Sequence, residues 1–382
     1  MQPHDMQPHA SPGGSRRRRP PVIATRRMVA LTGGLCASPG GMVLIRHLSA
    51  GSAGPASTMQ PPSGSFGGGA NTMQYDYSGT NSVSLTVGED STTVIDGTDI
   101  TASSSGSNGV FATDSGTVLV NDTSIETMAD NSRGLDATYG GTISANKITA
   151  DTQGGHSAIV ATDRGGGSIS LADATLSTAG SGSLLLYSTG DIQVNNVSGT
   201  SSGSQIAGME GLNTILIKDS TLESTVTGKT ASDPIANGII IYQSTSGGVT
   251  ADTISSVDLY LLDGAAWIGA ATITDNAAAG SGTGTASDAP ITVNVDGTST
   301  WGVAKDTTIS ALNVASGSDG NTVTIVANGK TVVSGSGDVT VTVTGSYSTS
   351  VSAGSDTELS SDTIDRSEFD SRFGTSTAWT MA

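Results

Sequence analysis

The short segment Ala112-Thr113-Asp114-Ser115-Gly116 decides the fold, because copies of it return along the chain. The copies are Ala137-Thr138-Tyr139-Gly140-Gly141, Ala161-Thr162-Asp163-Arg164-Gly165 and, more loosely, Leu186-Tyr187-Ser188-Thr189-Gly190 and Ala207-Gly208-Met209-Glu210-Gly211. Their first residues lie 25, 24, 25 and 21 positions apart. Self-similarity at a short period is the signature of a repeat architecture, so we expect stacked copies of one structural unit.

A pair of apolar residues spaced two apart follows each corner, as in a strand with one buried side. The first members of these pairs are Val118, Ile143, Ile169, Ile192 and Ile215. In a parallel β-solenoid such residues stack about 4.8 Å apart and form a continuous narrow core. A β-sandwich would lack this self-similarity. We therefore predict an all-β fold, a right-handed parallel β-helix with coils of about 24 residues, about 11 of them over residues 78–350.

The composition agrees with a thin β-structure. Ser (56), Thr (52) and Gly (52) dominate the 382 residues, whereas aromatic residues are 4% and charged residues 13%. So few long side chains cannot fill a wide helical or α/β core, and no sustained run has apolar residues at helical spacing. Helix bundles and doubly wound folds are therefore excluded.

The charge is divided unevenly along the chain. Residues 1–50 carry seven Arg against Asp5, whereas the whole chain has a net charge of −18. The body is therefore strongly acidic. Nucleic acid is not expected as a partner, because its binding requires a basic face. No run of about 18 uninterrupted apolar residues occurs, so we expect no transmembrane segment.

Residues 1–70 are predicted to be a basic leader followed by a disordered linker rich in Gly, Ser and Pro. Thr25-Arg26-Arg27-Met28 resembles a twin-arginine export signal, and Ser49-Ala50-Gly51 offers small residues for cleavage. An organelle transit peptide or an upstream extension of the reading frame stays open. The export interpretation gives an extracellular or cell-surface location.

Three further regions follow the leader. Residues 71–250 are predicted to hold the β-helix repeats, 251–365 a C-terminal β-helical capping section, and 366–382 a tail. Leu259-Tyr260-Leu261-Leu262 and Trp267-Ile268 form the most apolar cluster of the body and suit a thicker end section. The repeat loses register at Gly247-Gly248, which is either a natural shortening or a deletion in the gene model.

The repeats between Gly109 and Gly247, and the block with Ile291-Thr292-Val293-Asn294-Val295 and Ser299-Thr300-Trp301, resemble bacterial surface and secreted proteins with a right-handed parallel β-helix. Such proteins include autotransporter passenger domains and β-helix proteins of Gram-positive gut bacteria. The resemblance covers roughly residues 75–365 and implies an extracellular rod used in adhesion. The chain departs from it after Trp379, where neither an outer-membrane barrel nor a wall-sorting motif follows.

The search for catalytic chemistry is mostly negative. No set of His, Cys or carboxylate residues has metal-ligand spacing, no Gly-x-Ser-x-Gly elbow stands between a strand and a helix, and no phosphate-binding loop occurs. No cofactor and no metal are therefore expected. His156 lies beside paired glycines, as a solvated turn residue does.

One set of corner residues could contact a glycan. In the proposed stack Asp114, Tyr139 and Asp163 occupy the same corner of successive coils, which puts the two carboxylates about 9 to 10 Å apart. Inverting glycosidases place their carboxylates about 6.5 to 9.5 Å apart, and Arg164 could bind a uronate. The alternative is that Asp at a corner containing Gly is turn chemistry.

The expected function is that of a secreted or cell-surface structural or adhesive solenoid without enzymatic activity. Its partners would be a host or environmental glycan or a cell-surface protein. A polysaccharide-binding or polysaccharide-degrading β-helix is the alternative. A third class, ice binding, would need Thr113, Thr138 and Thr162 to form one exposed file.

Overall fold

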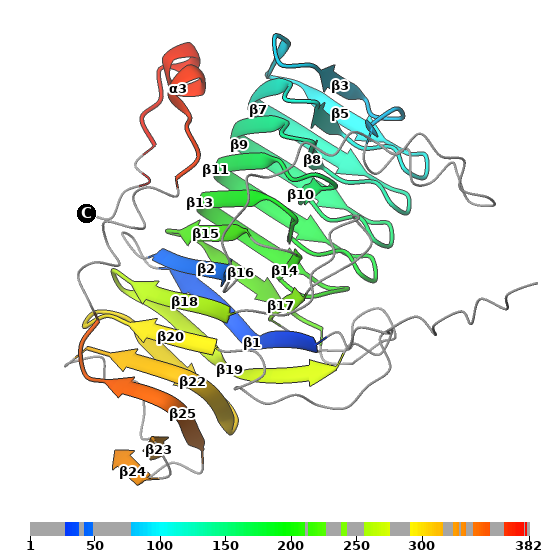
Figure 1. Cartoon of the computed structure of the whole chain (residues 1–382). Coiled ribbons are helices and arrows are strands. Elements are labelled where there is room, and N and C mark those ends of the chain that lie inside the picture. The colour runs from blue at the N-terminus through cyan, green and yellow to red at the C-terminus, as the bar shows by residue number, and fades with distance from the viewer. Residues whose placement is uncertain are drawn as a thin grey trace, which may run out of the picture.

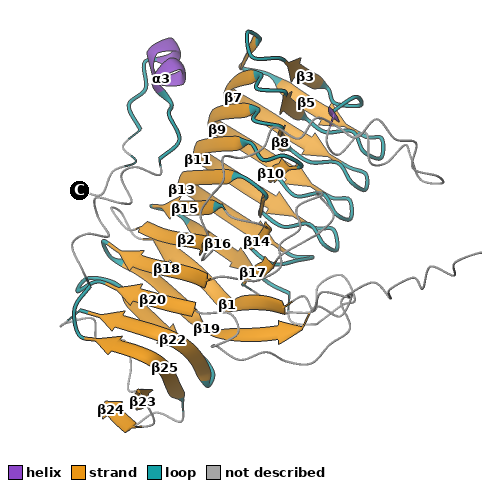
Figure 2. Cartoon of the chain, in the orientation of Figure 1, coloured by secondary structure: helices purple, strands orange, loops and turns teal. Residues whose placement is uncertain are grey.

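The computed structural model describes residues 27–37, 42–48, 78–210, 213–226, 238–242, 256–275, 291–315, 324–327, 330–333, 339–351, 363–377 and 379. Strands account for 58% of it and stack as a β-solenoid of about 6 turns, with coils of about 25 residues (Figures 1 and 2). The predicted fold class is confirmed. The predicted number of coils is too high. Beyond residue 256 the coils are irregular in length, since Val257 pairs with Ile291 but Val293 pairs with Leu312.

Each regular coil contributes one strand segment to each of three faces. The first face contains, in parallel order, β3 (Ser84–Val87), β6 (Val110–Thr113), β8 (Leu135–Thr138), β10 (Val160–Asp163), β12 (Leu186–Ser188), β14 (Ala207–Glu210) and β17 (Ile239–Tyr242). The second and third faces are the two halves of β7 (Thr117–Thr127), β9 (Thr142–Thr152), β11 (Ser168–Thr178) and β13 (Asp191–Ser201). These halves are separate strands in the flanking coils, namely β4 (Thr92–Asp96) and β5 (Asp99–Ala102) before β7, and β15 (Thr214–Lys218) and β16 (Thr221–Ser224) after β13.

A left-handed residue separates the second face from the third in successive coils. These residues are Asp122, Lys147, Asp173, Asn196 and Asp219, with φ between 48° and 55°. Asp and Asn tolerate this conformation better than most residues, which explains why four of the five bends use them. Asn121 and Asn146 lie opposite each other one residue before this bend.

The predicted apolar ladder lies in the core, beside further ladders such as Val110, Leu135 and Val160 on the first face. Val118, Ile143, Ile169, Ile192 and Ile215 lie in register on neighbouring strands, and none is more than 1% exposed. Burying one such side chain stabilises the fold by about 1.5–3 kcal/mol relative to leaving it in water. The ladder therefore contributes substantially to the stability of this part of the chain.

In the buried loops between the third and first faces, serine hydroxyls accept hydrogen bonds from backbone N–H groups. The N–H of Ser107 donates to Ser132 Oγ (3.1 Å), that of Ser132 to Ser157 Oγ (2.9 Å), and that of Ser157 to Ser183 Oγ (2.9 Å). All four residues are buried. Buried N–H groups need partners, so this ladder lets a serine-rich chain bury its turns.

Two leader segments form strands within the stack, contrary to the expectation that residues 1–70 lie outside the core. β1 (Arg27–Ala37) is antiparallel to β16 and β17 on one side and to β19 (Ala265–Asp275) on the other. β2 (Met42–Leu48) lies between β15 and β18 (Ser256–Leu262) (Figure 1). The layer of the stack after β17 is thus formed by β1 and β2 and not by the residues that follow β17 in the chain. Ile45 of β2 is fully buried in this layer.

The C-terminal section continues the stack with coils of irregular length. Its remaining strands are β20 (Ile291–Val295), β21 (Thr300–Val303), β22 (Thr307–Val314), β23 (Thr324–Ala327), β24 (Lys330–Val333) and β25 (Thr340–Ser348). Of the predicted apolar cluster, Leu259, Leu261, Leu262 and Trp267 are buried, whereas Ile268 is 67% exposed. Trp267 stacks on Trp301 of the next coil, with ring centroids 4.9 Å apart and planes within 3°.

The segment 363–379, which includes helix α3 (Ser367–Phe373), docks on the second face. Gln193 accepts the N–H of Ile364 (2.8 Å) and donates to its carbonyl (3.0 Å). Nη1 of Arg366 donates to the Ser170 carbonyl (2.7 Å), Ser170 Oγ (2.9 Å) and the Ala145 carbonyl (3.2 Å). The predicted tail is therefore packed against the solenoid from its first residue.

Two predictions fall on residues outside the described set. They are the linker from Gly51 to Asn71 and the join at Gly247-Gly248. No helix among the described residues is long and apolar enough to cross a membrane.

Candidate functional site

Asp114 and Tyr139, two of the predicted glycan contacts, lie opposite each other at the corner between the first and second faces. Asp114 is exposed and Tyr139 is half-buried, and the N–H of Ser115 donates to the Tyr139 carbonyl (3.1 Å). Both have positive φ, 53° for Asp114 and 45° for Tyr139. Their backbones therefore have turn conformations that few residue types adopt readily.

Asp163 does not lie level with Tyr139, so the predicted alignment of this corner is wrong. Asp163 pairs with Thr138, because the register joins Val110 to Leu135 and Leu135 to Val160. The repeated letters Ala-Thr placed Ala161 opposite Ala137, but the buried ladder of Val110, Leu135 and Val160 decides the pairing. The N–H of Tyr139 instead donates to the Arg164 carbonyl (3.1 Å).

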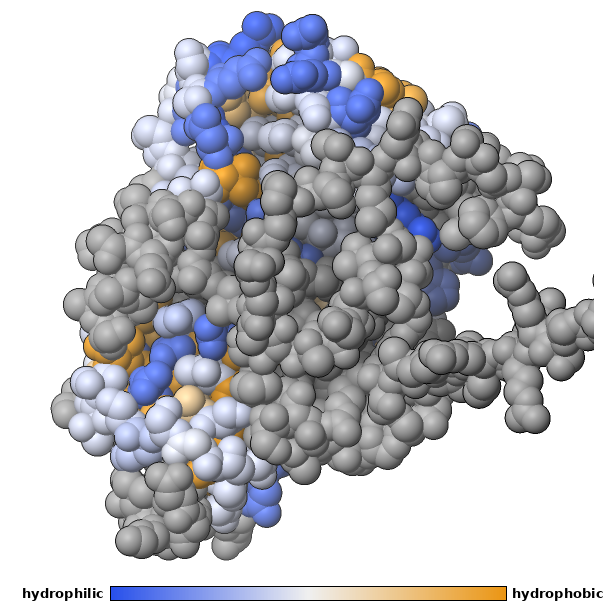
Figure 3. Space-filling model, viewed as in Figure 1, coloured by the Kyte–Doolittle hydropathy of each residue, from blue (hydrophilic) through white to orange (hydrophobic). Residues whose placement is uncertain are grey.

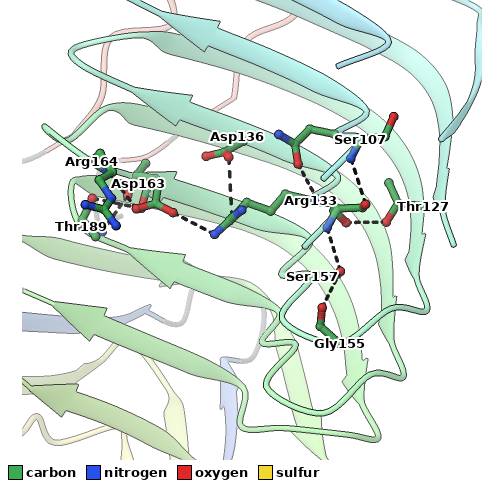
Figure 4. Close-up of polar contacts among 12 residues, drawn as sticks. Ser107, Thr127, Arg133, Asp136, Gly155, Ser157, Asp163, Arg164 and Thr189 are labelled. Atoms are coloured by element: carbon green, nitrogen blue, oxygen red, sulfur yellow. Dashed lines mark hydrogen bonds and ion pairs between the residues drawn. The ribbon is translucent and has the colours of Figure 1, made fainter. Parts of the chain in front are cut away.

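Asp163 belongs to a buried ionic cluster on the outer side of the first face (Figure 4). Arg133 Nη2 donates to Asp163 Oδ2 at 2.8 Å, and Arg133 Nε lies 3.7 Å from Asp136 Oδ2. Asp136 is fully buried, whereas Asp163 is 8% and Arg133 9% exposed. Asp163 also accepts the N–H of the half-buried Arg164 (2.8 Å). Removing one partner of a buried ion pair leaves the other charge without compensation, so Asp163 has a structural role.

The threonines proposed as an exposed file are buried, so that expectation is wrong. Thr113 is 5% exposed, and Thr138 and Thr162 are fully buried. Thr138 Oγ1 donates to Thr113 Oγ1 (2.8 Å), whereas Thr162 lies level with Ala137. Thr162 shares the parity of the core residue Val160, whereas Thr113 and Thr138 share the parity of Phe111 and Asp136 on the outer side of the first face, which is also buried.

An exposed row of hydroxyl residues does exist, on the third face. We call it the hydroxyl file: Ser124, Thr149, Thr175, Ser198 and Thr221, which pair in this order across β7, β9, β11, β13 and β16. All five are exposed. Neighbouring members are separated by the spacing between strands, about 4.8 Å. Their nearly regular spacing of 23 to 26 residues is visible in the sequence, but it lies outside the repeated corner segment that predicted Thr113, Thr138 and Thr162.

A second row lies beside the hydroxyl file, two residues further along each strand. Its members are Glu126, Asp151, Ser177, Thr200 and Glu223. The third face therefore presents a row of hydroxyl groups beside a row of three carboxylates and two hydroxyls. In the view of Figure 3 the described residues are mostly blue or white, with small separate orange patches, so the visible surface is mainly polar.

The fold and this surface define a β-solenoid repeat protein with one open polar face. No family model matches the chain, and neither a curated protein nor a solved structure matches it. Among the described residues, no three His, Cys, Asp or Glu side chains are grouped so that they could hold a metal ion.

Proposed function

We propose that this protein is a secreted or cell-surface β-solenoid of bacterial surface-protein type that binds an extended glycan through its third face without chemical turnover. The observation that carries the proposal is the hydroxyl file, in which Ser124, Thr149, Thr175, Ser198 and Thr221 are exposed on consecutive coils. A polymer with a repeating pattern of hydroxyl groups can donate to and accept from such a grid many times over.

Repetition supports a polymer more than a small ligand. A single exposed hydroxyl offers one weak contact, because water competes for it. Several equivalent contacts on one rigid surface act together, and their combined affinity can exceed that of each contact by orders of magnitude. The acidic row with Glu126, Asp151 and Glu223 favours neutral or cationic glycans over uronate polymers.

An adhesive role without catalysis is supported by the chemistry of the predicted corner. Asp163 is engaged by Arg133 at 2.8 Å, and Asp114 has the backbone of a turn residue. Glycoside hydrolysis would require two carboxylates facing one bond, one of them available as an acid.

The experiment compares two matched double variants of the full chain. Thr149→Val with Thr175→Val removes two neighbouring hydroxyls from the hydroxyl file, whereas Thr308→Val with Thr342→Val removes a neighbouring pair on β22 and β25. Valine keeps the shape and the strand preference of threonine. Retardation in native gels containing neutral polysaccharides should fall at least tenfold in the first variant and stay unchanged in the second.

Three results would overturn the proposal: equal retardation of both variants, no retardation of the parent by any polysaccharide, or release of reducing ends by the parent. Fractionation of cells carrying the tagged chain tests the location separately. Recovery in the cytosol would contradict the secreted or cell-surface assignment.

A further inference from the structure

A pocket of about 560 Å³ lies between the second face and the docked C-terminal segment. One wall carries Thr117, Thr142, Ser168 and Asp191, which lie in register on β7, β9, β11 and β13, and Thr214 on β15. The opposite wall is formed by residues 363–369 of the C-terminal segment. The pocket therefore exists only while that segment is docked.

The polar groups of the pocket are mainly hydroxyls and carboxylates. Hydroxyl residues line the wall on the sheet, and Asp191, Asp365 and Glu368 bring carboxylates from both walls. Desolvation raises the pKa of the Asp191 carboxyl, although the N–H of Thr214, 3.0 Å from Asp191 Oδ1, partly offsets the effect. Asp191 is exposed on the sheet, so a ligand can reach its carboxylate.

The charge of the pocket disfavours anions. Arg366 is the cation of its lining, and its Nη1 is engaged by Ser170 and Ala145 on the sheet. A carboxylate, sulfate or phosphate ligand would therefore meet three carboxylates. A bound metal ion is also disfavoured, because no group of metal-ligating side chains occurs among the residues that the structure describes.

We propose that this pocket binds a neutral carbohydrate unit, whose hydroxyls donate to Asp191, Asp365 and Glu368 and accept from Thr142 and Ser168. The volume falls in the range of about 300 to 1,000 Å³ usual for small-molecule sites. The class of ligand rests on the proposed function, but the site is separate from the hydroxyl file, because it lies on the second face.

Docking of the C-terminal segment and binding of the sugar are coupled in this arrangement. Gln193 holds Ile364 by two hydrogen bonds, and Ser170 holds Arg366. A ligand that contacts both walls binds only the docked state. Docking and ligand binding therefore favour each other, and each increases the equilibrium constant of the other by the same factor.

Calorimetric titration of the full chain tests the proposal with five probes: maltotriose, cellotriose, tri-N-acetylchitotriose, trigalacturonate and spermidine. We expect at least one neutral trisaccharide to bind, and the uronate and the polyamine not to bind. Asp191→Asn should weaken that binding at least tenfold, because the amide replaces an acceptor by a donor. Gln193→Ala should weaken it as well, and saturating sugar should slow amide exchange across 363–377 in the parent.

Four outcomes would overturn the pocket: no binding of any neutral trisaccharide, binding of spermidine or trigalacturonate instead, unchanged affinity in Asp191→Asn with an unchanged unfolding midpoint, or exchange at 363–377 unaffected by sugar. The Thr149→Val, Thr175→Val variant separates the two proposals. This variant should keep trisaccharide binding, because its substitutions lie outside the pocket. If it also binds polymers as the parent does, the proposed role of the hydroxyl file fails while the pocket proposal stands.

Discussion

Cys36 of β1 lies directly opposite Ala266 of β19 in an antiparallel pair. Opposite residues of such a pair have Cα atoms about 4.5 to 5.5 Å apart, within the range of about 4.4 to 6.8 Å that a disulfide spans. Because Cys36 is the one cysteine of the sequence, a single substitution can report this pairing.

Ala266→Cys should therefore form a disulfide with Cys36 under mild oxidation, without distorting the strands. Loss of both free thiols, measured by mass after alkylation of the unreduced monomer, checks this. Ala271→Cys is the control, because it lies on the same strand opposite Leu31, well away from Cys36. If Ala266→Cys keeps both thiols, the leader does not occupy this layer.

Ile192→Asp should destabilise the solenoid by about 3 kcal/mol or more, because it places a carboxylate between Ile169 and Ile215 in a dry ladder. Denaturant unfolding gives the free energy directly. Ser198→Asp on the same strand is exposed and should change stability by no more than about 0.5 kcal/mol. A parent-like transition for Ile192→Asp would disprove the register.

Asp296 should make the C-terminal section sensitive to acid. Burial alone would raise its pKa, but together the donors around it lower the pKa below its ordinary value: the N–H groups of Asp263 (2.6 Å), Thr298 (2.9 Å) and Ser299 (2.8 Å), and the Thr298 hydroxyl (2.9 Å). A lowered pKa means that Asp296 stabilises the fold above its unfolded pKa and loses this effect as the pH falls through the folded value.

Asp296→Asn should therefore be less stable than the parent at neutral pH, and the difference should shrink as the pH falls below about 4. Unfolding midpoints of the two proteins between pH 7 and pH 2.5 test this. A difference that is independent of pH would assign the effect of the substitution to shape and not to charge.

Arg366→Lys should release the C-terminal segment. The guanidinium donates three hydrogen bonds through Nη1 and stacks on Phe369, 4.5 Å from the ring centroid, and burial lowers its pKa to about 10. Lysine can reproduce neither the planar stacking nor this geometry. Amide exchange of residues 363–377 should therefore accelerate at least tenfold, whereas Arg372→Lys, at an exposed position of the same helix, should leave it unchanged.

The inner ladders could be predicted from the sequence because each coil needs apolar side chains at the same positions. Val118, Ile143 and Ile169 recur at nearly equal intervals, and a narrow core accepts only apolar side chains there. The corner with Asp163 was misaligned because its loop is longer. Both sides of the first face are buried there, so Ala and Thr occur at positions of either parity and the matching letters Ala-Thr do not mark matching positions.

The leader strands and the docked tail gave no such signal. Arg366 and Ser170 are far apart in the sequence, and their contact occurs once in the chain. β1 pairs antiparallel with strands from distant coils, so its residues share no period with them. Contacts of this kind follow from the shape and the hydrogen-bonding needs of a stack already formed, which a local pattern does not encode.

The layer filled by β1 and β2 has a consequence for synthesis. These strands leave the ribosome first, yet β19, the partner along the whole length of β1, ends only at Asp275. At about 5–20 residues per second, the leader waits on the order of ten seconds or more with unpaired edges. The coils on both sides must form before β1 and β2 can be enclosed, so the order of folding differs from the order of translation. A nascent chain that stalls before Asp275 therefore carries β1 without its complete partner strand.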